Sequence, residues 1–125
     1  MDILSTTAAP KAVGPYSQAI KACGFLFCSG QIGIDPVTNK LAAEDTKTQT
    51  EQILKNISAI LAQESLNLSD VIKTTIFLES LDDFQIVNDT YAGYFGCHKP
   101  ARSTVQVAAL PLKAKIEIEC IAELD

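Results

Sequence analysis

The last part of the chain carries an arginine whose neighbours leave room for a ligand. Arg102 stands in the segment Pro100-Ala101-Arg102-Ser103, beside residues with small side chains. A guanidinium stays charged at physiological pH and can hold a planar carboxylate through two parallel hydrogen bonds. The same charge also suits an ordinary solvated sheet face, and composition alone does not decide between these two interpretations.

Polar residues alternate along the two segments that are expected to form the last strands. Arg102, Thr104 and Gln106 fall on one side of the first segment, and Glu117 and Glu119 fall on one side of the second. If these strands pair as an antiparallel hairpin with Thr104 opposite Glu117, Arg102 faces Glu119. The sequence therefore predicts one polar sheet face that Arg102 and Glu117 share.

The cysteine and histidine pattern argues against a metal site. Cys23, Cys28, Cys97 and Cys120 form no C-x-x-C pair, and His98 is the only histidine. No export signal supports disulfides, so we expect reduced and mostly packed cysteines. The sequence calls for neither a metal nor an organic cofactor.

The elements that position these residues follow from hydrophobic periodicity and turn signals. Residues 18–34 predict a β-hairpin broken at Gly24, and Asp45 is placed to cap a helix over residues 46–64. Further along, we expect a strand, a helix capped by Ser80, and two final strands joined as a hairpin, with the strands at residues 71–78, 102–108 and 114–123. The order ββαβαββ predicts an α+β fold, a mixed sheet with both helices on one face.

Composition limits the classes of protein to consider. The chain has 125 residues, a hydrophobic fraction of 47% and a net charge of -5, which predicts a single domain over residues 1–125. The acidic balance disfavours nucleic acid as a partner. No run of residues approaches the length of a membrane span or an export signal, so we expect a cytoplasmic protein.

Several short motifs occur in one order over most of the chain. They are Gly14-Pro15-Tyr16-Ser17-Gln18-Ala19, Cys28-Ser29-Gly30-Gln31-Ile32, Lys73-Thr74-Thr75-Ile76-Phe77-Leu78, Asp83-Phe84 with Asn88, Pro100-Ala101-Arg102-Ser103 and Ile116-Glu117-Ile118-Glu119. Together they resemble the RidA (YjgF) family of reactive-intermediate deaminases. Any one of these motifs alone would be weak support.

The resemblance implies a chorismate-mutase-like fold and a homotrimer with ligand clefts at the subunit interfaces. The implied activity is hydrolysis of 2-imino acids such as 2-iminobutanoate and 2-iminopropanoate, and of their enamine tautomers. These compounds are released by pyridoxal-phosphate dehydratases that act on serine or threonine. The products are a 2-oxo acid and ammonia.

The resemblance also implies roles for individual residues. Arg102 matches the arginine that binds the substrate carboxylate, and Glu117 matches the glutamate that positions the attacking water. Matches to cleft-lining, substrate-binding positions are Tyr16, Ser29, Gly30, Asn88 and Thr104. Some family members have cysteine where this chain has Thr104, so a role that depends on a thiol is in doubt there, whereas a backbone role would survive.

A second departure from the family lies just before Arg102. The connection Gly96-Cys97-His98-Lys99 is shorter than in some members and lacks the aromatic residue that can precede Pro-Ala-Arg-Ser. A shift in the preferred size of substrate is expected from this change. We interpret Cys97 as an exposed loop thiol rather than a catalytic residue, because a reactive thiol needs neighbours that favour its thiolate and nothing nearby guarantees them.

Two other functions remain open at this point. A non-catalytic module could use the same intersubunit cleft to bind small carboxylates and regulate a partner enzyme. Retention of both Arg102 and Glu117 favours catalysis, since a binder has less need of a water-activating carboxylate. A ribonuclease or translation inhibitor, as described for some relatives, fits the acidic charge poorly.

Overall fold

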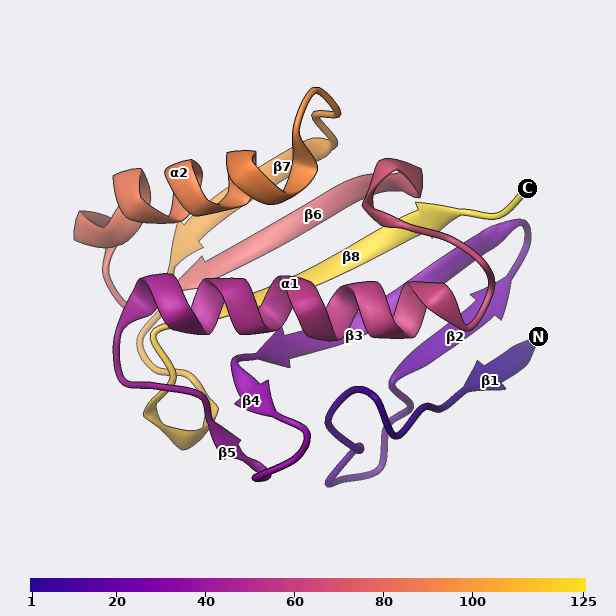
Figure 1. Cartoon of the computed structure of the whole chain (residues 1–125), viewed down its shortest axis with the longest axis horizontal. Coiled ribbons are helices and arrows are strands. Elements are labelled where there is room, and N and C mark those ends of the chain that lie inside the picture. The colour runs from indigo at the N-terminus through magenta and orange to yellow at the C-terminus, as the bar shows by residue number, and fades with distance from the viewer.

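The computed structural model describes all 125 residues and contains one large twisted sheet with both α-helices on the same face (Figure 1). The sheet has six strands in the order β1-β2-β3-β8-β6-β7, and β4 and β5 form a separate small ladder. The strands are β1 (Asp2–Leu4), β2 (Ala19–Ala22), β3 (Phe25–Ile32), β4 (Ile34–Asp35), β5 (Lys40–Leu41), β6 (Val71–Leu78), β7 (Ala101–Gln106) and β8 (Ile116–Glu123). The helices are α1 (Thr46–Ala62) and α2 (Phe84–Phe95), with three 3-10 turns, η1 (Leu68–Asp70), η2 (Leu81–Asp83) and η3 (Pro111–Lys113).

The predicted α+β class and the order ββαβαββ are confirmed by β2, β3, α1, β6, α2, β7 and β8. Sequence reasoning missed the short strand β1 and the β4–β5 ladder. Each is only two or three residues long, which is too short to show a period of two.

The first hairpin turns where glycine predicted it. Ala22 pairs with Phe25, which leaves Cys23 and Gly24 as a two-residue loop. Both loop residues have positive φ, 55° and 83°, as a type I′ turn requires. This turn suits the twist of the flanking strands, so β2 and β3 pair in register.

Helix α1 begins at the predicted cap and supplies much of the core. The Asp45 carboxylate accepts a hydrogen bond of 2.8 Å from the backbone N–H of Thr48, and this bond lowers the pKa of Asp45. The apolar stripe predicted from three-and-four spacing is buried, namely Ile53, Leu54, Ile57, Ile60 and Leu61. It packs against the sheet in one cluster of 21 buried residues.

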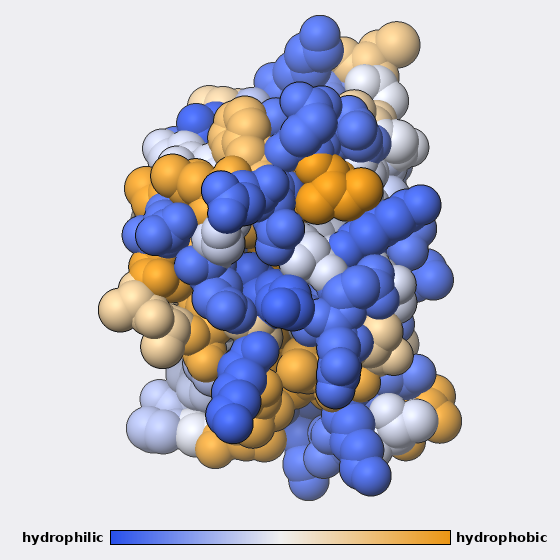
Figure 2. Space-filling model, turned by 90° about the vertical axis from the view of Figure 1, so that its left-hand side faces the viewer, coloured by the Kyte–Doolittle hydropathy of each residue, from blue (hydrophilic) through white to orange (hydrophobic).

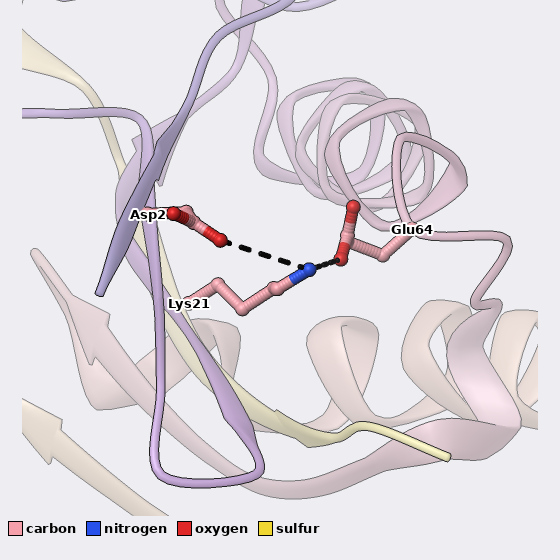
Figure 3. Close-up of polar contacts among 3 residues, drawn as sticks. All are labelled: Asp2, Lys21 and Glu64. Carbon is pink, nitrogen blue, oxygen red and sulfur yellow. Dashed lines mark hydrogen bonds and ion pairs between the residues drawn. The ribbon is translucent and has the colours of Figure 1, made fainter.

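An ion pair joins the far end of α1 to the edge of the sheet (Figure 3). The Lys21 ammonium on β2 lies 2.6 Å from a carboxylate oxygen of Glu64, just beyond α1, and 3.9 Å from Asp2 on β1. The hydrogen bond to Glu64 is the main cause of the raised pKa of Lys21. Lys21 and Asp2 are partly or largely exposed, whereas Glu64 is mostly covered. Solvent screens such a pair, so the contact adds little to stability.

Helix α2 begins slightly later than its cap. The Ser80 hydroxyl oxygen accepts a hydrogen bond from the backbone N–H of Asp82, which starts the short turn η2 that runs directly into α2. The predicted capping residue is therefore confirmed, but it caps the 3-10 turn rather than α2 itself.

The predicted hairpin of the last two strands is wrong. β7 pairs in parallel with β6, and β6 lies between β7 and β8. Because α2 carries the chain back along the sheet, β7 runs in the same direction as β6, as in other crossover connections. Residues 107–115 then pass beyond β6 to reach the centre of the sheet, where the more apolar strand β8 is buried.

This order of strands separates the two charged residues that were expected to share a face. Arg102 pairs with Thr74, and both residues lie on the side of the sheet that the helices cover. Glu117 stands between Ile116 and Ile118, which are buried under the helices, so its side chain lies on the opposite side. We call these two sides the helix face and the open face. Arg102 lies on the helix face and Glu117 on the open face, so the predicted contact of Arg102 with Glu119 does not form.

The end of the molecule seen in Figure 2 is covered mainly by hydrophilic residues, with apolar residues scattered between them. None of the helices combines the length and the apolar character needed to cross a membrane.

Candidate functional site

Arg102 is held by side chains of helix α2. One guanidinium nitrogen, Nη2, donates a hydrogen bond of 2.7 Å to the amide oxygen of Asn88. The guanidinium carbon lies 5.1 Å from the ring centre of Tyr91 and 5.7 Å from that of Phe84, within the range of cation–π attraction. Asn88 leaves several guanidinium N–H groups unused, so Arg102 is oriented and can still bind a carboxylate.

Tyr91 is itself fixed, which makes the support of Arg102 rigid. Its hydroxyl shares a hydrogen bond of 2.8 Å with the hydroxyl of Thr74 on β6. Its ring stacks on Phe95 with 4.3 Å between ring centres. Burial is the main cause of the raised pKa of Tyr91, so this hydroxyl stays neutral beside the guanidinium.

Arg102 has no carboxylate partner in its own chain. The only ion pairs of the structure are those that Lys21 makes. An arginine fixed by a neutral amide and two aromatic rings keeps its full positive charge available. This group of residues, Arg102 with Asn88, Tyr91 and Phe84, is called the arginine side below.

Thr104 adds two unused polar groups near Arg102. Its hydroxyl is the one buried side-chain oxygen of the structure without a hydrogen-bond partner. The backbone N–H of Val107 donates to the carbonyl of Leu78 on β6. Because backbone groups alternate in direction along a strand, those of Arg102 and Thr104 point to the free edge of the sheet. That edge therefore offers hydrogen-bond donors close to the guanidinium.

Gln106, the third residue on this side of the strand, is occupied. Its side-chain oxygen accepts a hydrogen bond of 2.8 Å from the backbone N–H of Leu81. Its side-chain oxygen thus helps to start the turn that leads into α2.

Glu117 lies in a different hollow, against the backbone of β3. The register of β3 shifts between Cys28 and Gln31, and Gly30 lies within this irregular stretch. A Cβ atom on Gly30 would come within 2.6 Å of a Glu117 carboxylate oxygen. Only glycine leaves room for the carboxylate in this position, which explains why glycine stands between Ser29 and Gln31.

Burial alters the acidity of Glu117. The carboxylate is about half-buried, and this burial, with a smaller contribution from the like charge of Glu119, raises its pKa. A carboxylate with a raised pKa is a stronger base when it is ionised. Glu117 is therefore better suited to take a proton from water than an exposed glutamate.

Tyr16 and Gly30 line the same hollow as Glu117, which has a volume of about 240 Å³. Ser29 does not line this hollow. Its hydroxyl donates a hydrogen bond of 2.6 Å to the carbonyl of Ser17, so it fixes the segment that carries Tyr16. We call Glu117, Gly30 and Tyr16 the glutamate side.

The residues predicted to form the site thus fall into two groups within one chain. One group lies at the edge of the sheet and consists of Arg102, Asn88 and Thr104. The other lies at the hollow beside β3 and β8 and consists of Tyr16, Gly30 and Glu117. The cavity beside Arg102 and the hollow at Glu117 share no lining residue.

Sequence reasoning assigned no contact with Arg102 to Phe84 or Tyr91 and missed their role in holding its guanidinium. The three-and-four spacing of Phe84, Asn88 and Tyr91 puts all three on one face of α2. A polar residue between two aromatic residues on one helix face is a signal that could have indicated this support.

The cysteines take no part in either group. Cys28 and Cys120 are paired positions on β3 and β8 and are buried, as expected. Cys97 is exposed, which agrees with its interpretation as a loop thiol. Cys23 in the first hairpin is exposed as well, so the expectation of mostly packed cysteines holds for only two of the four.

Comparisons with known proteins agree on one family. A family model described as Endoribonuclease L-PSP matches residues 6–124. The protein named Reactive Intermediate Deaminase A, chloroplastic, from Arabidopsis thaliana is 56% identical over 98% of this chain, which spans 66% of the length of that protein.

Two solved structures share the whole fold. A protein of the conserved Rid family from Yersinia pestis, YyfA, has a TM-score of 0.96 at 48% identity, with 98% of each chain covered. TdcF from E. coli, solved with bound serine, has a TM-score of 0.94 at 40% identity, with 100% of each chain covered.

Proposed function

Because this chain belongs to the RidA (YjgF) family of reactive-intermediate deaminases, we propose that it hydrolyses 2-imino acids to 2-oxo acids and ammonia. The substrates proposed are 2-iminobutanoate and 2-iminopropanoate, with their enamine tautomers. One water is consumed for each imine, the C=N bond is replaced by C=O, and no electrons are exchanged.

The observation that carries this proposal is the unpaired charge of Arg102. The guanidinium is oriented by Asn88 and by aromatic rings, and no carboxylate of its own chain neutralises it. The carboxylate of the substrate would accept two parallel hydrogen bonds from the Arg102 guanidinium, and the backbone N–H of Thr104 would be a further donor at the free edge of the sheet. This binding fixes the neighbouring imine carbon in space.

Glu117 supplies the second requirement, a base for the attacking water. As water adds to the imine carbon, Glu117 accepts one of its protons and returns it to the imine nitrogen, which gives a neutral carbinolamine. The hydroxyl proton of the carbinolamine then moves to the nitrogen as the C–N bond breaks, so that ammonia leaves and the 2-oxo acid remains. Glu117 regains its ionised form, so the cycle needs no cofactor.

Two copies of the chain are needed to bring these groups together. Arg102 and Glu117 lie on opposite faces of one sheet and beside separate cavities, so one chain cannot place both against one small substrate. We propose a homotrimer in which the arginine side of one subunit meets the glutamate side of the next. The open face, with the half-exposed apolar side chains of Phe27 and Val105, is a suitable contact surface.

The similarity to TdcF supports a small substrate of this kind. That relative was solved with bound serine, which carries a carboxylate beside a carbon that bears nitrogen. The cytoplasmic location expected from the sequence stays a prediction, and the name of the Arabidopsis relative includes the word chloroplastic.

The principal test follows the fate of an imine that is released in solution. A threonine dehydratase reaction is run with an imine trap, and 2-oxobutanoate release is compared with the trapped adduct. The protein is expected to raise the share of 2-oxobutanoate at the expense of the adduct. No change in this partition at any protein concentration would overturn the deaminase proposal and favour the non-catalytic carboxylate-binding module.

A further inference from the structure

Gln18, which stands immediately before β2, is a buried polar residue with an exposed fraction of 4%. Its amide oxygen accepts a hydrogen bond of 2.7 Å from the backbone N–H of Thr6. Its amide nitrogen donates to the carbonyl of Thr6 at 3.1 Å, and to those of Ala9 and Pro10 at 3.4 Å and 2.7 Å. One side chain therefore holds a stretch of backbone that lies well before it in the sequence.

The backbone that Gln18 binds belongs to a segment with little other support. Residues 5–17, called the N-terminal segment below, join β1 to β2 and contain neither strand nor helix (Figure 1). Ala9 is the only residue of this segment that is buried. The Ser29 hydroxyl holds just the end of the segment, at the carbonyl of Ser17. The amide of Gln18 is therefore the main link between the N-terminal segment and the sheet.

The N-terminal segment forms one wall of the hollow at Glu117. The residues of the segment that line the hollow are Pro10, Lys11, Val13 and Tyr16. Tyr16 is about half-exposed, and its ring lies over its own segment, since a Cβ atom on Gly14 would lie 3.5 Å from two ring carbons. The position of Tyr16 thus follows the path of the segment, and this path depends on Gln18.

Glutamine is the side chain that matches the backbone groups presented to it. The segment offers one N–H and three carbonyl groups, and a side-chain amide has an acceptor oxygen and two N–H donors. Glutamate has no N–H when it is ionised, and methionine has the length but not the polar groups. A buried amide is costly unless it is hydrogen-bonded, so Gln18 and the segment hold each other in one arrangement.

We propose that Gln18 is a positioning residue for imine hydrolysis. Its amide fixes the N-terminal segment, so that Tyr16 closes the hollow in which Glu117 activates water. This inference rests on the proposed function. A wall that is already ordered before the substrate arrives needs no ordering during binding. A displacement of about 1 Å in such a wall costs roughly a hundredfold in rate.

The test replaces Gln18 by methionine, which keeps the length of the side chain and removes its hydrogen bonds. An L-amino-acid oxidase with catalase converts 2-aminobutanoate to 2-iminobutanoate, and semicarbazide traps what is not hydrolysed. For Gln18→Met, kcat should be at least about tenfold lower than for the unmodified protein. KM should change less than kcat, because the carboxylate still binds at Arg102.

Gln49→Met is the matched control. Gln49 is 1% exposed, and its amide also bonds to backbone groups, accepting from the N–H of Lys115 at 2.9 Å and donating to the carbonyls of Ala43 and Glu44 at 3.0 Å and 3.4 Å. It lines neither the hollow at Glu117 nor the cavity beside Arg102. Both substitutions should lower the thermal midpoint, but Gln49→Met should leave kcat and KM unchanged.

Hydrogen exchange gives a second readout that does not depend on catalysis. In Gln18→Met the backbone N–H of Thr6 loses its acceptor, so peptides that span Thr6 should exchange at least about fivefold faster. The same peptides should exchange at the unmodified rate in Gln49→Met. If Gln18→Met does not fold, Gln18→Glu takes its place, because it keeps the bond from Thr6 and loses only the N–H donors.

Equal kcat values for Gln18→Met and Gln49→Met would overturn the inference, and hydrolysis by both variants would leave the proposed function standing. Unchanged exchange at Thr6 in Gln18→Met would also overturn it, because Gln18 would then not hold the segment. Failure of the unmodified protein to accelerate hydrolysis would overturn the proposed function and the catalytic part of this inference together, whereas the exchange rates would still decide whether Gln18 fixes the N-terminal segment.

Discussion

The arginine side and the glutamate side are built by different means. Side chains of α2 hold Arg102, through the amide of Asn88 and the ring of Tyr91. The backbone instead shapes the place of Glu117, because Gly30 leaves the space that its carboxylate occupies. The first group is charged at every physiological pH, whereas the second has a pKa that burial changes. Binding and water activation are therefore open to separate changes by mutation.

Glu117→Gln is expected to have the largest effect on catalysis. The amide keeps the size of the carboxylate but cannot accept a proton from water, so kcat should fall by about 10² to 10⁴-fold. Binding of 2-oxobutanoate should change little, because the arginine side is intact. Stopped assays of imine hydrolysis and calorimetry measure the two quantities. Full activity of this variant would remove Glu117 from the mechanism.

Gly30→Ala is expected to have the next largest effect, and it acts without removing a functional group. The new Cβ would displace the Glu117 carboxylate, which is the flexible end of a side chain, so the fold should survive. A displacement of about 1 Å in a catalytic group costs roughly a hundredfold in rate, and we expect a loss of that order.

Gly93→Ala is the matched control for this variant. A Cβ at Gly93 meets nothing within 4 Å, and alanine is favoured over glycine within a helix such as α2. Activity should stay the same and thermal stability should rise slightly. Equal activity of the two variants would show that the close approach at Gly30 is unimportant for catalysis.

The structural features that the sequence predicts correctly are local ones. The turn at Gly24, the cap at Asp45 and the buried stripe of α1 each depend on a few adjacent residues. The pairing of β7 does not depend on adjacent residues alone. Its neighbour in the sheet is determined by the preceding helix and by the more apolar β8, which takes the centre of the sheet.

The same limit applies to the site. Arg102 and Glu117 were identified by their types and by family resemblance, and alternation along each strand was correct. The prediction that they share one face of the sheet was wrong, because the face on which a residue lies depends on how its strand pairs with its neighbours. The Tyr91 ring under Arg102 was missed because an aromatic residue at helical spacing resembles any other core residue.

Arg102→Lys tests the arginine side with its charge unchanged. An ammonium cannot present two parallel N–H groups in one plane, and it would lose the arrangement with Asn88 and Tyr91. One charge-assisted hydrogen bond is worth about 1.5 to 3 kcal/mol, so KM should rise at least about tenfold, with a smaller change in kcat. A larger fall in kcat than rise in KM would indicate that Arg102 acts mainly in the transition state.

The smallest change in activity is expected from the pH dependence that Glu117 gives to the rate. Burial and then Glu119 raise the pKa of Glu117, so the acidic limb of the rate profile should lie above the ordinary range of glutamate. Glu119→Gln removes the smaller of the two causes, and the limb should move to lower pH while the maximal rate stays the same. A limb that does not move would assign the raised pKa to burial alone.

The raised pKa of Glu117 also predicts how folding stability depends on pH. A carboxyl whose pKa is higher in the folded chain binds its proton more tightly there, so its burial opposes folding once it is ionised. This penalty is absent below the unfolded pKa of about 4.3 and grows as the pH rises through the folded pKa. Glu117→Gln should therefore be more stable than the unmodified protein at neutral pH, and this advantage should vanish in acid. Denaturant unfolding at several pH values measures the difference, and an advantage that persists at low pH would trace it to packing rather than to charge.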